Sequence, residues 1–455
     1  MNYDLIIIGW GKGGKTLASQ LPETWKVALI EKDPKMFGGT CINIGCLPSK
    51  SLVNDAHLIT KLDDSNFERN YEINNNFFKQ AIQHKNDLVS FLNQKNYEKL
   101  AFKSNVDIYV GNASFINETQ IQIKELNGNI LNIFAPKIII NTGAKTRKLN
   151  FDSSWDTRNI IYSEEALNLN ELPKKLLIVG AGFIGLEFAS FYTNFGSEVT
   201  ILQNNNLFLP SEDEDTAHEI LKTLNDQNIS INFNSQILDL SEFNEQTKVT
   251  YTNNDEVITE TFDKILISIG RIPNVEDLNL AATNVELNER KEIKVNDYLQ
   301  TSNPNIYAIG DVKGGPQFTY ISLDDSRIVF NHLNNDLSYS LKARNLIPIA
   351  TFISPTYARV GLTEKEIINK NIPYKKKFAN VASIPKARVI RETKGFVKIL
   401  IDENDYIIGA SLSMSNAEEV INLIAVAIKN KIKSKELKNF IYTHPTMTES
   451  LNEIL

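Results

Sequence analysis

Two segments of this sequence repeat one pattern, and that pattern restricts the fold more than any other feature. Residues 5–14 read LIIIGWGKGG and residues 176–185 read LLIVGAGFIG. In each, an apolar run leads into glycines spaced G-x-G-x-x-G, which is typical of a buried parallel strand, a tight turn and a helix. A second apolar stretch follows each, at 26–30 and 198–202. We therefore predict an α/β protein with two Rossmann-like dinucleotide-binding domains.

The first glycine turn, formed by Gly9, Gly11 and Gly14, predicts a complete dinucleotide site. The first glycine allows the turn, the second lets the backbone approach a pyrophosphate, and the third lets the helix pack on the strand. Glu31 stands 22 positions after Gly9, where a carboxylate can accept hydrogen bonds from an adenosine ribose. The alternative is a glycine-rich turn that serves packing alone.

The second turn, formed by Gly180, Gly182 and Gly185, repeats the arrangement, but its following strand ends at Gln203. An acidic residue there would favour NADH, and a nearby arginine or lysine would favour NADPH. The neutral amide of Gln203 favours neither nucleotide, so we expect both NADH and NADPH to act as the reductant. A purely structural domain is the alternative.

The two cysteines, Cys41 and Cys46, lie in GGTCINIGCLPSK at residues 38–50. Gly45 and Pro48 flank Cys46 at a predicted helix start, where the partial positive charge of the helix end favours the reactive thiolate. The alternative is a pair of inert buried thiols. No metal site is predicted, because the histidines show no metal-ligand spacing: His57, His84, His218, His332 and His444.

Composition excludes several other classes of protein. A net charge of −7 disfavours a constitutive nucleic-acid binder, which needs a basic surface. The sequence contains no uninterrupted run of about 18 apolar residues, so no membrane-spanning helix is predicted. The amino terminus lacks the basic residues and long apolar run of a signal peptide. We expect a cytoplasmic protein that binds neither nucleic acid nor membrane.

The carboxyl-terminal part has a different pattern. From about residue 346, short strands alternate with amphipathic helices such as 417–430, which predicts an α+β domain. Near the end, His444 and Glu449 form a candidate acid–base pair of the kind that assists a cysteine nucleophile.

Taken together, these motifs resemble the FAD-dependent pyridine nucleotide–disulfide reductases, the family of dihydrolipoamide dehydrogenase, glutathione reductase and mercuric reductase. The segments TGA at 142–144, GRIPN at 270–274 and YAIGD at 307–311 extend the resemblance over essentially the whole chain. It implies an FAD-binding domain at 1–150 and 271–340, an NADH- or NADPH-binding domain at 151–270, and a dimerisation domain at 341–455. The functional unit would be a homodimer.

The resemblance also implies specific roles for residues. Asp311 would hold the flavin ribitol, the backbone of Ala113 would touch FAD, and residues 317–320 would start a helix aimed at the flavin. The residues implied to bind FAD are Gly9, Gly11, Gly14, Glu31, Gly39, Thr40, Lys50, Ala113, Thr142, Gly143, Gly310, Asp311, Gln317, Phe318, Thr319 and Tyr320. Those implied to bind NAD(P)H are Gly180, Gly182, Gly185, Glu187, Gln203 and Gly270.

The same resemblance implies a catalytic mechanism. Cys46 would be the thiolate in contact with flavin, and Cys41 the exposed nucleophile. Lys50 and Glu187 would form an ion pair beside the flavin. His444 from the other subunit, oriented by Glu449, would be the acid–base group.

The substrate is narrowed by further likenesses. The chain lacks the additional carboxyl-terminal cysteines of mercuric reductases, which disfavours mercury as substrate. Residues 315–325 and 208–210 depart from dihydrolipoamide dehydrogenases and look like the bacterial hypothiocyanous acid reductase branch. We therefore expect reduction of hypothiocyanous acid (HOSCN). The alternatives are dihydrolipoamide dehydrogenase or another low-molecular-weight disulfide reductase, and, from another class, a flavin-binding redox sensor.

Overall fold

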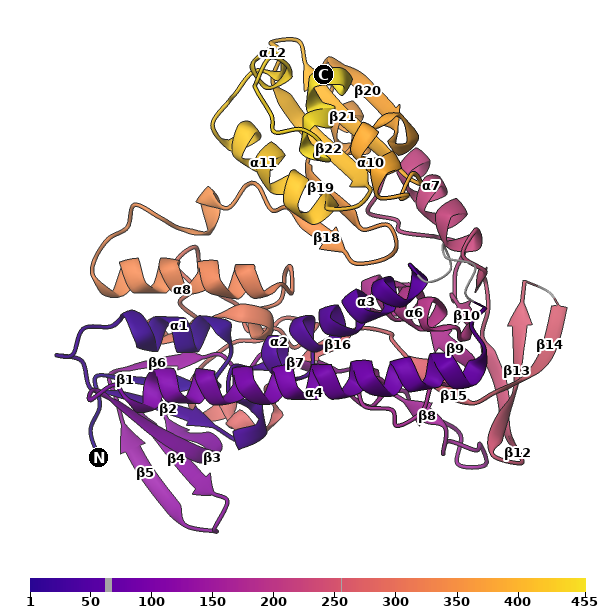
Figure 1. Cartoon of the computed structure of the whole chain (residues 1–455). Helices are drawn as coiled ribbons and strands as arrows, with labels where there is room; N and C mark the ends of the chain where they lie inside the picture. The colour runs from indigo at the N-terminus through magenta and orange to yellow at the C-terminus, as the bar shows by residue number, and fades with distance from the viewer. Residues whose placement is uncertain (62–67, 255) are drawn as a thin grey trace. The chain divides into compact units, whose positions relative to one another are not determined.

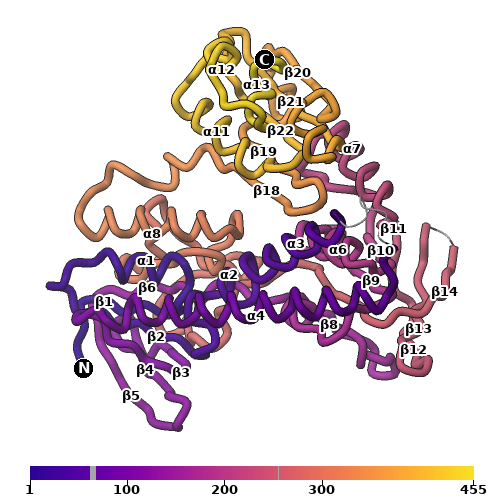
Figure 2. The backbone as a smooth tube through the Cα atoms, viewed as in Figure 1, coloured from indigo at the N-terminus to yellow at the C-terminus, as the bar shows by residue number. Residues whose placement is uncertain are grey.

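The computed structural model describes residues 1–61, 68–254 and 256–455, drawn in Figures 1 and 2. The chain forms two compact units. The first comprises residues 1–51, 82–149 and 270–344, and the second 52–81, 150–269 and 345–455. The first unit gathers most of the segments predicted for the FAD-binding domain. The described residues of the second form three sheets, one parallel and two antiparallel. The predicted three-domain boundaries stay predictions.

The first unit contains a seven-stranded sheet in the order β17-β6-β1-β2-β3-β4-β5. The first five of these strands are parallel neighbours, and β4 and β5 continue from β3 as antiparallel strands. The bounds are β1 Leu5–Ile8, β2 Val27–Glu31, β3 Val106–Asn117, β4 Gln120–Glu125, β5 Ile130–Phe134, β6 Lys137–Ile140 and β17 Ile306–Ala308. A separate antiparallel pair joins β7 Ala144–Thr146 and β16 Arg271–Pro273.

Strand β1 is buried on both faces, which explains its continuous apolar sequence. Leu5 and Ile7 belong to one core cluster, and Ile6 and Ile8 belong to another. Helices α1 (Lys12–Gln20) and α8 (Thr319–Leu333) lie side by side (Figure 1). Their contact is close, because Gly13 N donates a hydrogen bond of 3.0 Å to Ser322 Oγ.

Helix α1 begins at Lys12. Two residues of the glycine-rich segment, Gly13 and Gly14, therefore lie inside the first helical turn. The other helices near the cysteines are α2 Thr40–Asn43, α3 Cys46–Thr60 and α4 Tyr71–Ala101, and η5 (Gly310–Lys313) is a short 3₁₀ helix before α8.

The second unit contains a five-stranded parallel sheet in the order β11-β10-β9-β15-β8. The strands are β8 Ile160–Ile161, β9 Lys175–Val179, β10 Glu198–Leu202, β11 Ile229–Asn232 and β15 Lys264–Ile267. The helices of this part are α5 Ser163–Ala166, α6 Phe183–Phe195 and α7 Glu214–Asn225. A three-stranded antiparallel sheet is formed by β12 Ile237–Phe243, β13 Gln246–Asn253 and β14 Glu256–Phe262.

The carboxyl-terminal part of this unit is α+β, as predicted. Its antiparallel sheet has the order β18-β19-β22-β21-β20, with bounds β18 Ile349–Thr351, β19 Tyr357–Gly361, β20 Tyr374–Asn380, β21 Phe396–Asp402 and β22 Ile407–Ser413. Helix α11 (Ala417–Lys429) buries its apolar face against this sheet. The other helices are α9 Glu364–Asn369, α10 Pro385–Val389, α12 Ser434–Lys438 and α13 Leu451–Ile454.

None of the helices in the described ranges combines the length and the apolar character that crossing a bilayer requires.

Candidate active site

The two cysteines lie next to one another at the junction of two helices. Cys41 is in α2, and Cys46 is the first residue of α3, as predicted. Both are free thiols. A hydrogen bond to Cys46, together with burial, raises the pKa of Cys41. Cys46 lies in the first turn of α3, a position whose partial positive charge favours a thiolate.

The exposure of the two thiols differs from the expectation. Cys46 is exposed, whereas Cys41, the expected exposed nucleophile, is partly buried. Residue 39 lies against the first helical turn of the chain: a Cβ at Gly39 would lie 2.8 Å from Gly11 Cα. The residues that cap the amino-terminal ends of α1 and α2, Gly11 and Gly39, are therefore in close contact.

Thr319, a predicted FAD residue, lies beside Cys46. Its Oγ1 is 3.5 Å from Cys46 Sγ, although the two residues are 273 positions apart. Thr319 is the first residue of α8, so the thiol lies at the amino-terminal end of that helix too. Phe318 and Tyr320 stack their rings at 5.1 Å, and Tyr320 is 42% exposed. Gln317 precedes this turn.

The first glycine turn is filled by an asparagine from a neighbouring strand. Asn141 follows β6 directly, and its Nδ2 donates a hydrogen bond of 3.2 Å to Gly9 O. A Cβ at either Gly11 or Gly14 would lie 2.7 Å from the same Nδ2. A side chain at either position would therefore have to displace the Asn141 amide, whatever its effect on a ligand.

Glu31 accepts hydrogen bonds from three backbone amides around the first turn. Its Oε2 accepts from Trp10 N (3.0 Å), and its Oε1 accepts from Lys32 N (2.9 Å) and Asp33 N (3.2 Å). Burial raises the pKa of Glu31, and the three amides oppose that rise. The carboxylate is thus held rigidly at the end of β2, where the sequence places a ribose contact.

The later predicted FAD residues also lie in the first unit. Thr142 and Gly143 bond to Asn274, through Thr142 Oγ1 to Asn274 O (2.7 Å) and Asn274 N to Gly143 O (3.0 Å). Gly310 N donates to Asp325 Oδ2 (2.7 Å). Those that complete the set in this unit are Thr40 at the start of α2, Lys50 in α3, and Ala113, which pairs with Ile123 between β3 and β4.

These residues fit a bound dinucleotide. Helix α1 has no acidic residue in its first turn and no side-chain cap, so its amide groups are suited to a pyrophosphate. A Cβ at Gly143 would meet no described atom within 4 Å. Burial raises the pKa of Asp311, and its carboxylate makes no hydrogen bond or ion pair with another residue in the described ranges. A ligand hydroxyl group at Asp311 would satisfy that carboxylate.

The second glycine turn repeats the first with different side chains. Ser268 follows β15 directly, and its Oγ donates to Gly180 O and Val179 O, both at 3.0 Å. A Cβ at Gly185 would lie 2.8 Å from the same Oγ, whereas a Cβ at Gly182 would meet nothing within 4 Å. Helix α6 likewise has no acidic residue in its first turn. The open Gly182 position leaves room for a nucleotide to approach the backbone.

Gln203 takes the position that Glu31 has in the first unit. Its Oε1 accepts from Ala181 N (3.0 Å), and its Nε2 donates to Asn205 Oδ1 (3.1 Å) and Leu207 O (3.4 Å). The loop from residue 203 to residue 209 contains no charged side chain. This loop therefore offers a nucleotide no basic or acidic side chain beside the neutral amide of Gln203.

Lys50 belongs to the first unit and Glu187 to the second, and the ion pair between them stays a prediction. Within the second unit, Glu187 is buried and its Oε1 accepts from Phe352 N (3.0 Å). Gly270, expected at the nicotinamide nucleotide, belongs to the first unit.

His444 and Glu449 are brought together as predicted. His444 Nδ1 is 2.8 Å from Glu449 Oε2, and the imidazole is 72% exposed. Glu449 is held in turn, because its Oε1 accepts from Thr446 N (3.2 Å). The carboxylate therefore orients the exposed ring through Nδ1.

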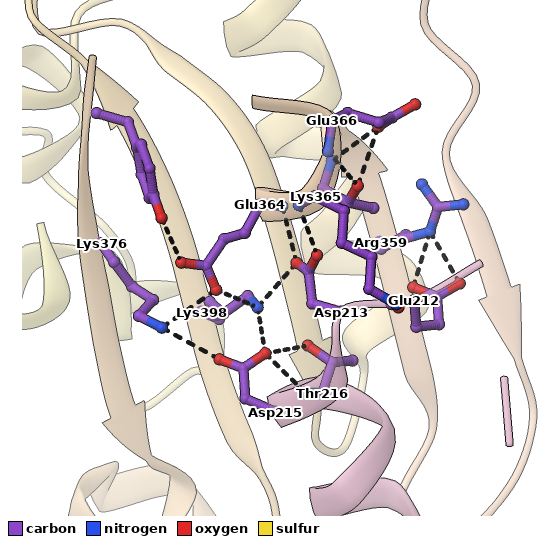
Figure 3. A network of polar contacts seen from close by, with 12 residues as sticks. Glu212, Asp213, Asp215, Thr216, Arg359, Glu364, Lys365, Glu366, Lys376 and Lys398 are labelled. Carbon is purple, nitrogen blue, oxygen red and sulfur yellow. Dashed lines mark hydrogen bonds and ion pairs between the residues drawn. The ribbon is translucent and has the colours of Figure 1, made fainter. Parts of the chain in front are cut away.

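One group of carboxylates in the described chain is compact enough to suggest a metal, namely Asp213, Asp215 and Glu364. Figure 3 shows that Lys398 points into the middle of this group. Its buried Nζ lies 2.9, 2.6 and 2.9 Å from the three carboxylates in that order. An ammonium thus takes the position that a cation would need, and the network ties the start of α7 to β21.

Sequence reasoning missed the residues that hold the two turns, Asn141 and Ser268. A signal was present, because each follows the apolar strand that pairs with the first strand of its domain and stands two residues before a glycine. A polar residue two positions before a glycine thus occurs once for each glycine motif, in Asn141-Thr-Gly143 and in Ser268-Ile-Gly270.

Comparison with known proteins gives one result over the whole chain. The family model described as pyridine nucleotide-disulphide oxidoreductase matches residues 3–325, and its dimerisation domain matches residues 347–455. The pyridine nucleotide-disulfide oxidoreductase RclA of Escherichia coli is 40% identical over 99% of this chain and 98% of its own length. Dihydrolipoyl dehydrogenase of Mycoplasma pneumoniae is 31% identical over 100% of this chain and 98% of its own.

A solved structure agrees with this result. The Cu(II) complex of the HOCl-induced flavoprotein disulfide reductase RclA from Escherichia coli superposes with a TM-score of 0.91 and 39% identity, covering 100% of this chain and 99% of that one. Such a family implies FAD, a pyridine nucleotide and reduction of disulfides, and its dimerisation domain supports a homodimer. With both family models matched and its cysteine pair at a helix start, the chain belongs to the pyridine nucleotide–disulphide oxidoreductases.

Proposed function

We propose that this protein uses Cys41 and Cys46 to reduce a small sulfur oxidant, hypothiocyanous acid, at the expense of NADH or NADPH. The observation that carries the proposal is the contact between the two thiols at the start of α3, with Cys46 beside Thr319. The likeness of residues 315–325 and 208–210 to hypothiocyanous acid reductases supports the substrate. The 40% identity to RclA, a reductase that is induced by HOCl, supports a role in oxidant defence.

The cofactor would be held by the first unit. FAD, when bound, would pass two electrons from the nicotinamide to the Cys41–Cys46 disulfide. Glu31 would accept hydrogen bonds from the adenosine ribose, and the amide groups of α1 would face the pyrophosphate. Asp311 would bind the ribitol hydroxyl groups. The remaining contacts are assigned to Gly39, Thr40, Lys50, Ala113, Thr142, Gly143, Gly310 and residues 317–320.

The nucleotide would bind at the turn formed by Gly180, Gly182 and Gly185. Because the Gln203 amide is already engaged by Ala181 N, Asn205 and Leu207, it offers neither repulsion nor a charge-assisted bond to a 2′-phosphate. NADH and NADPH are both expected to serve.

The chemical step on the oxidant uses the thiols in turn. The Cys41 thiolate attacks the sulfur of HOSCN, forms an S–SCN bond and releases hydroxide, which takes up one thiol proton to become water. The Cys46 thiolate then attacks Cys41 Sγ, forms the disulfide and releases thiocyanate. Two electrons from NAD(P)H and the second thiol proton restore both thiols.

His444 is proposed to act on this chemistry from the partner subunit of a homodimer. Glu449 orients its ring through Nδ1, and the exposed imidazole is available to a second chain. In that position it would hold the proton removed from Cys41. Lys50 and Glu187 are proposed to pair beside the flavin.

A substrate panel tests the proposal. Wild type, Cys41→Ser and Cys46→Ser are assayed with HOSCN, lipoamide and glutathione disulfide, each with NADH and with NADPH. We expect HOSCN to be the best substrate and Cys41→Ser to abolish its steady-state reduction, while bleaching of the flavin by NAD(P)H remains. His444→Ala should slow turnover by about 10²–10⁴-fold at most, the range of a lost general acid–base.

The outcomes separate the alternatives. Full HOSCN turnover by Cys41→Ser would overturn the disulfide mechanism. Faster turnover of lipoamide or glutathione disulfide than of HOSCN would assign the protein to those substrates. Flavin reduction without turnover of any substrate would favour a redox sensor.

A further inference from the structure

One face of helix α8 holds two turns that are expected to contact FAD. Ser322 Oγ accepts a hydrogen bond of 3.0 Å from Gly13 N, in the first turn of α1. One helical turn further along α8, Asp325 Oδ2 accepts a hydrogen bond of 2.7 Å from Gly310 N. Gly310 directly precedes Asp311, the residue expected to bind the flavin ribitol. The same helix therefore contacts both the pyrophosphate turn and the turn that carries Asp311.

The Gly310 turn is packed tightly against α8. The φ of Gly310 is +72°, in the left-handed region that favours glycine. A Cβ at this position would lie 2.9 Å from Ser322 Oγ. Asp325 is fully buried, so an N–H group at Gly310 that lost this acceptor would be left in surroundings where a missing hydrogen bond is costly.

Asp325 contacts both ends of the short 3₁₀ helix η5, which contains Asp311. Gly310 begins this helix and Lys313 ends it. Lys313 Nζ lies 3.4 Å from Asp325 Oδ2, the same oxygen that accepts from Gly310 N. Between these two contacts, the Asp311 carboxylate makes no hydrogen bond or ion pair with another described residue. The backbone of the turn is thus held, while the carboxylate of Asp311 stays available to a ligand.

Arg344 holds the other oxygen of Asp325. Its Nη2 donates to Asp325 Oδ1 at 2.6 Å, and its Nε donates to Asp324 Oδ2 at 2.7 Å. One guanidinium therefore binds two consecutive carboxylates, and only 10% of its side chain is exposed. Charge-assisted bonds of this kind are short and directional. Because Arg344 engages Oδ1, the Oδ2 atom is kept in place for Gly310 N.

We propose that Asp325, held by Arg344, is a positioning residue for FAD, because it fixes the turn that presents Asp311 to the flavin ribitol. The inference rests on the proposed function only in taking Asp311 as a ribitol ligand, and it requires no particular substrate. A hydrogen bond from a ribitol hydroxyl to Asp311 depends on distance and direction. Loss of the Asp325 carboxylate should therefore speed the release of FAD from a protein that is still folded.

The test measures how fast FAD leaves the loaded protein. Each FAD-loaded variant is diluted and kept well below its unfolding temperature, and free flavin is separated by ultrafiltration at intervals. Asp325→Asn should release FAD about tenfold faster than wild type, because an amide offers one acceptor oxygen and no charge to three donors. The control is Asp324→Asn, which removes a carboxylate from the same guanidinium while the bond from Gly310 N to Asp325 stays. Its release rate should change by less than about twofold.

A double variant separates positioning from a general loss of stability. In Asp311→Ala the ribitol bond is already absent, so adding Asp325→Asn should speed release by less than about threefold. A merely structural role would give the same tenfold effect in both backgrounds, since independent effects add in free energy. If Asp311→Ala retains no flavin, Asp311→Asn takes its place in the same comparison.

The remaining outcomes also decide the case. Wild-type release by Asp325→Asn, or an equal effect in both backgrounds, overturns the inference. If Asp325→Asn does not fold, Arg344→Lys keeps a cation but loses the two-carboxylate fork, and its release rate decides: about threefold faster supports the inference, and no change overturns it. Unchanged release in Asp311→Ala would overturn both the inference and the assignment of Asp311. Failure of the HOSCN assay leaves these rates valid, so the two proposals fail separately.

Discussion

The turn at Gly9 and the turn at Gly180 are held in the same way but surrounded differently. In each, the residue after a neighbouring parallel strand donates a side-chain hydrogen bond to the first glycine carbonyl: Asn141 Nδ2 at 3.2 Å and Ser268 Oγ at 3.0 Å. The longer asparagine side chain also reaches the second glycine of its turn, whereas the position of Gly182 is open. The acceptor that ends the second strand differs as well.

In the first turn that acceptor is the Glu31 carboxylate, which accepts hydrogen bonds from three backbone N–H groups. In the second turn it is the side-chain amide of Gln203, which accepts from one backbone N–H group. Glu31 is bonded to Trp10, Lys32 and Asp33, and Gln203 to Ala181. The first turn is thus filled and tightly bonded, which suits a cofactor that stays bound. The second is more open, which suits a nucleotide that enters and leaves at each turnover. The predictions below test this contrast.

The largest effect is expected from alanine at the second glycine of each turn. Both Gly11 and Gly182 are helix N-caps, so any loss in capping is matched. Gly11→Ala places a methyl group 2.7 Å from Asn141 Nδ2 and should lower the free energy of unfolding by about 1–3 kcal/mol, with loss of FAD. Gly182→Ala should change stability by less than about 1 kcal/mol and raise KM for NADH.

Thermal unfolding and flavin absorbance measure both variants. The double variant Gly11→Ala with Asn141→Ala should regain part of the stability, because the crowding atoms are removed. Equal losses of stability from Gly11→Ala and Gly182→Ala would show that the two turns are not packed differently.

A loss of stability of similar size is expected from Glu31→Gln. The three donors approach both carboxylate oxygens, so one end of a glutamine must present its NH₂ group to an N–H donor. An unsatisfied buried donor should cost about 1–3 kcal/mol of unfolding free energy. Urea denaturation of the FAD-loaded protein measures it, with Glu31→Asp as the shorter carboxylate control. Wild-type stability in Glu31→Gln would mean that the carboxylate is not needed as an acceptor.

The smallest effect is expected from the reciprocal change, Gln203→Glu. One oxygen keeps the hydrogen bond from Ala181 N, and the new negative charge repels a 2′-phosphate. The ratio of kcat/KM for NADH to that for NADPH should rise about threefold to tenfold, which is no more than about 1.4 kcal/mol. Gln203→Asn is the neutral control. An unchanged ratio would place the ribose contact elsewhere than Gln203.

Much of the site could be predicted because its signals are local in the sequence. The glycine spacing, the acidic or neutral residue that ends the second strand, and the cysteine pair before Pro48 each occupy a short segment. Their local structure follows from strand, turn and helix propensities. The pair His444 and Glu449 was also predictable, because the two residues are separated by five positions, and the structure brings them to 2.8 Å.

The sequence by itself thus determined the family and the two dinucleotide-binding folds, and it predicted Cys41 and Cys46 as the redox pair. Only the tertiary structure decided which side chains support these motifs. Thr319 reaches Cys46 from 273 positions away, Asn141 reaches Gly9 from 132, and Asn96 reaches Lys15 from 81. The partial burial of Cys41 and the start of α1 at Lys12 were likewise decided by packing. Contacts of this kind depend on how separate strands and helices come together, and local sequence patterns do not encode that arrangement.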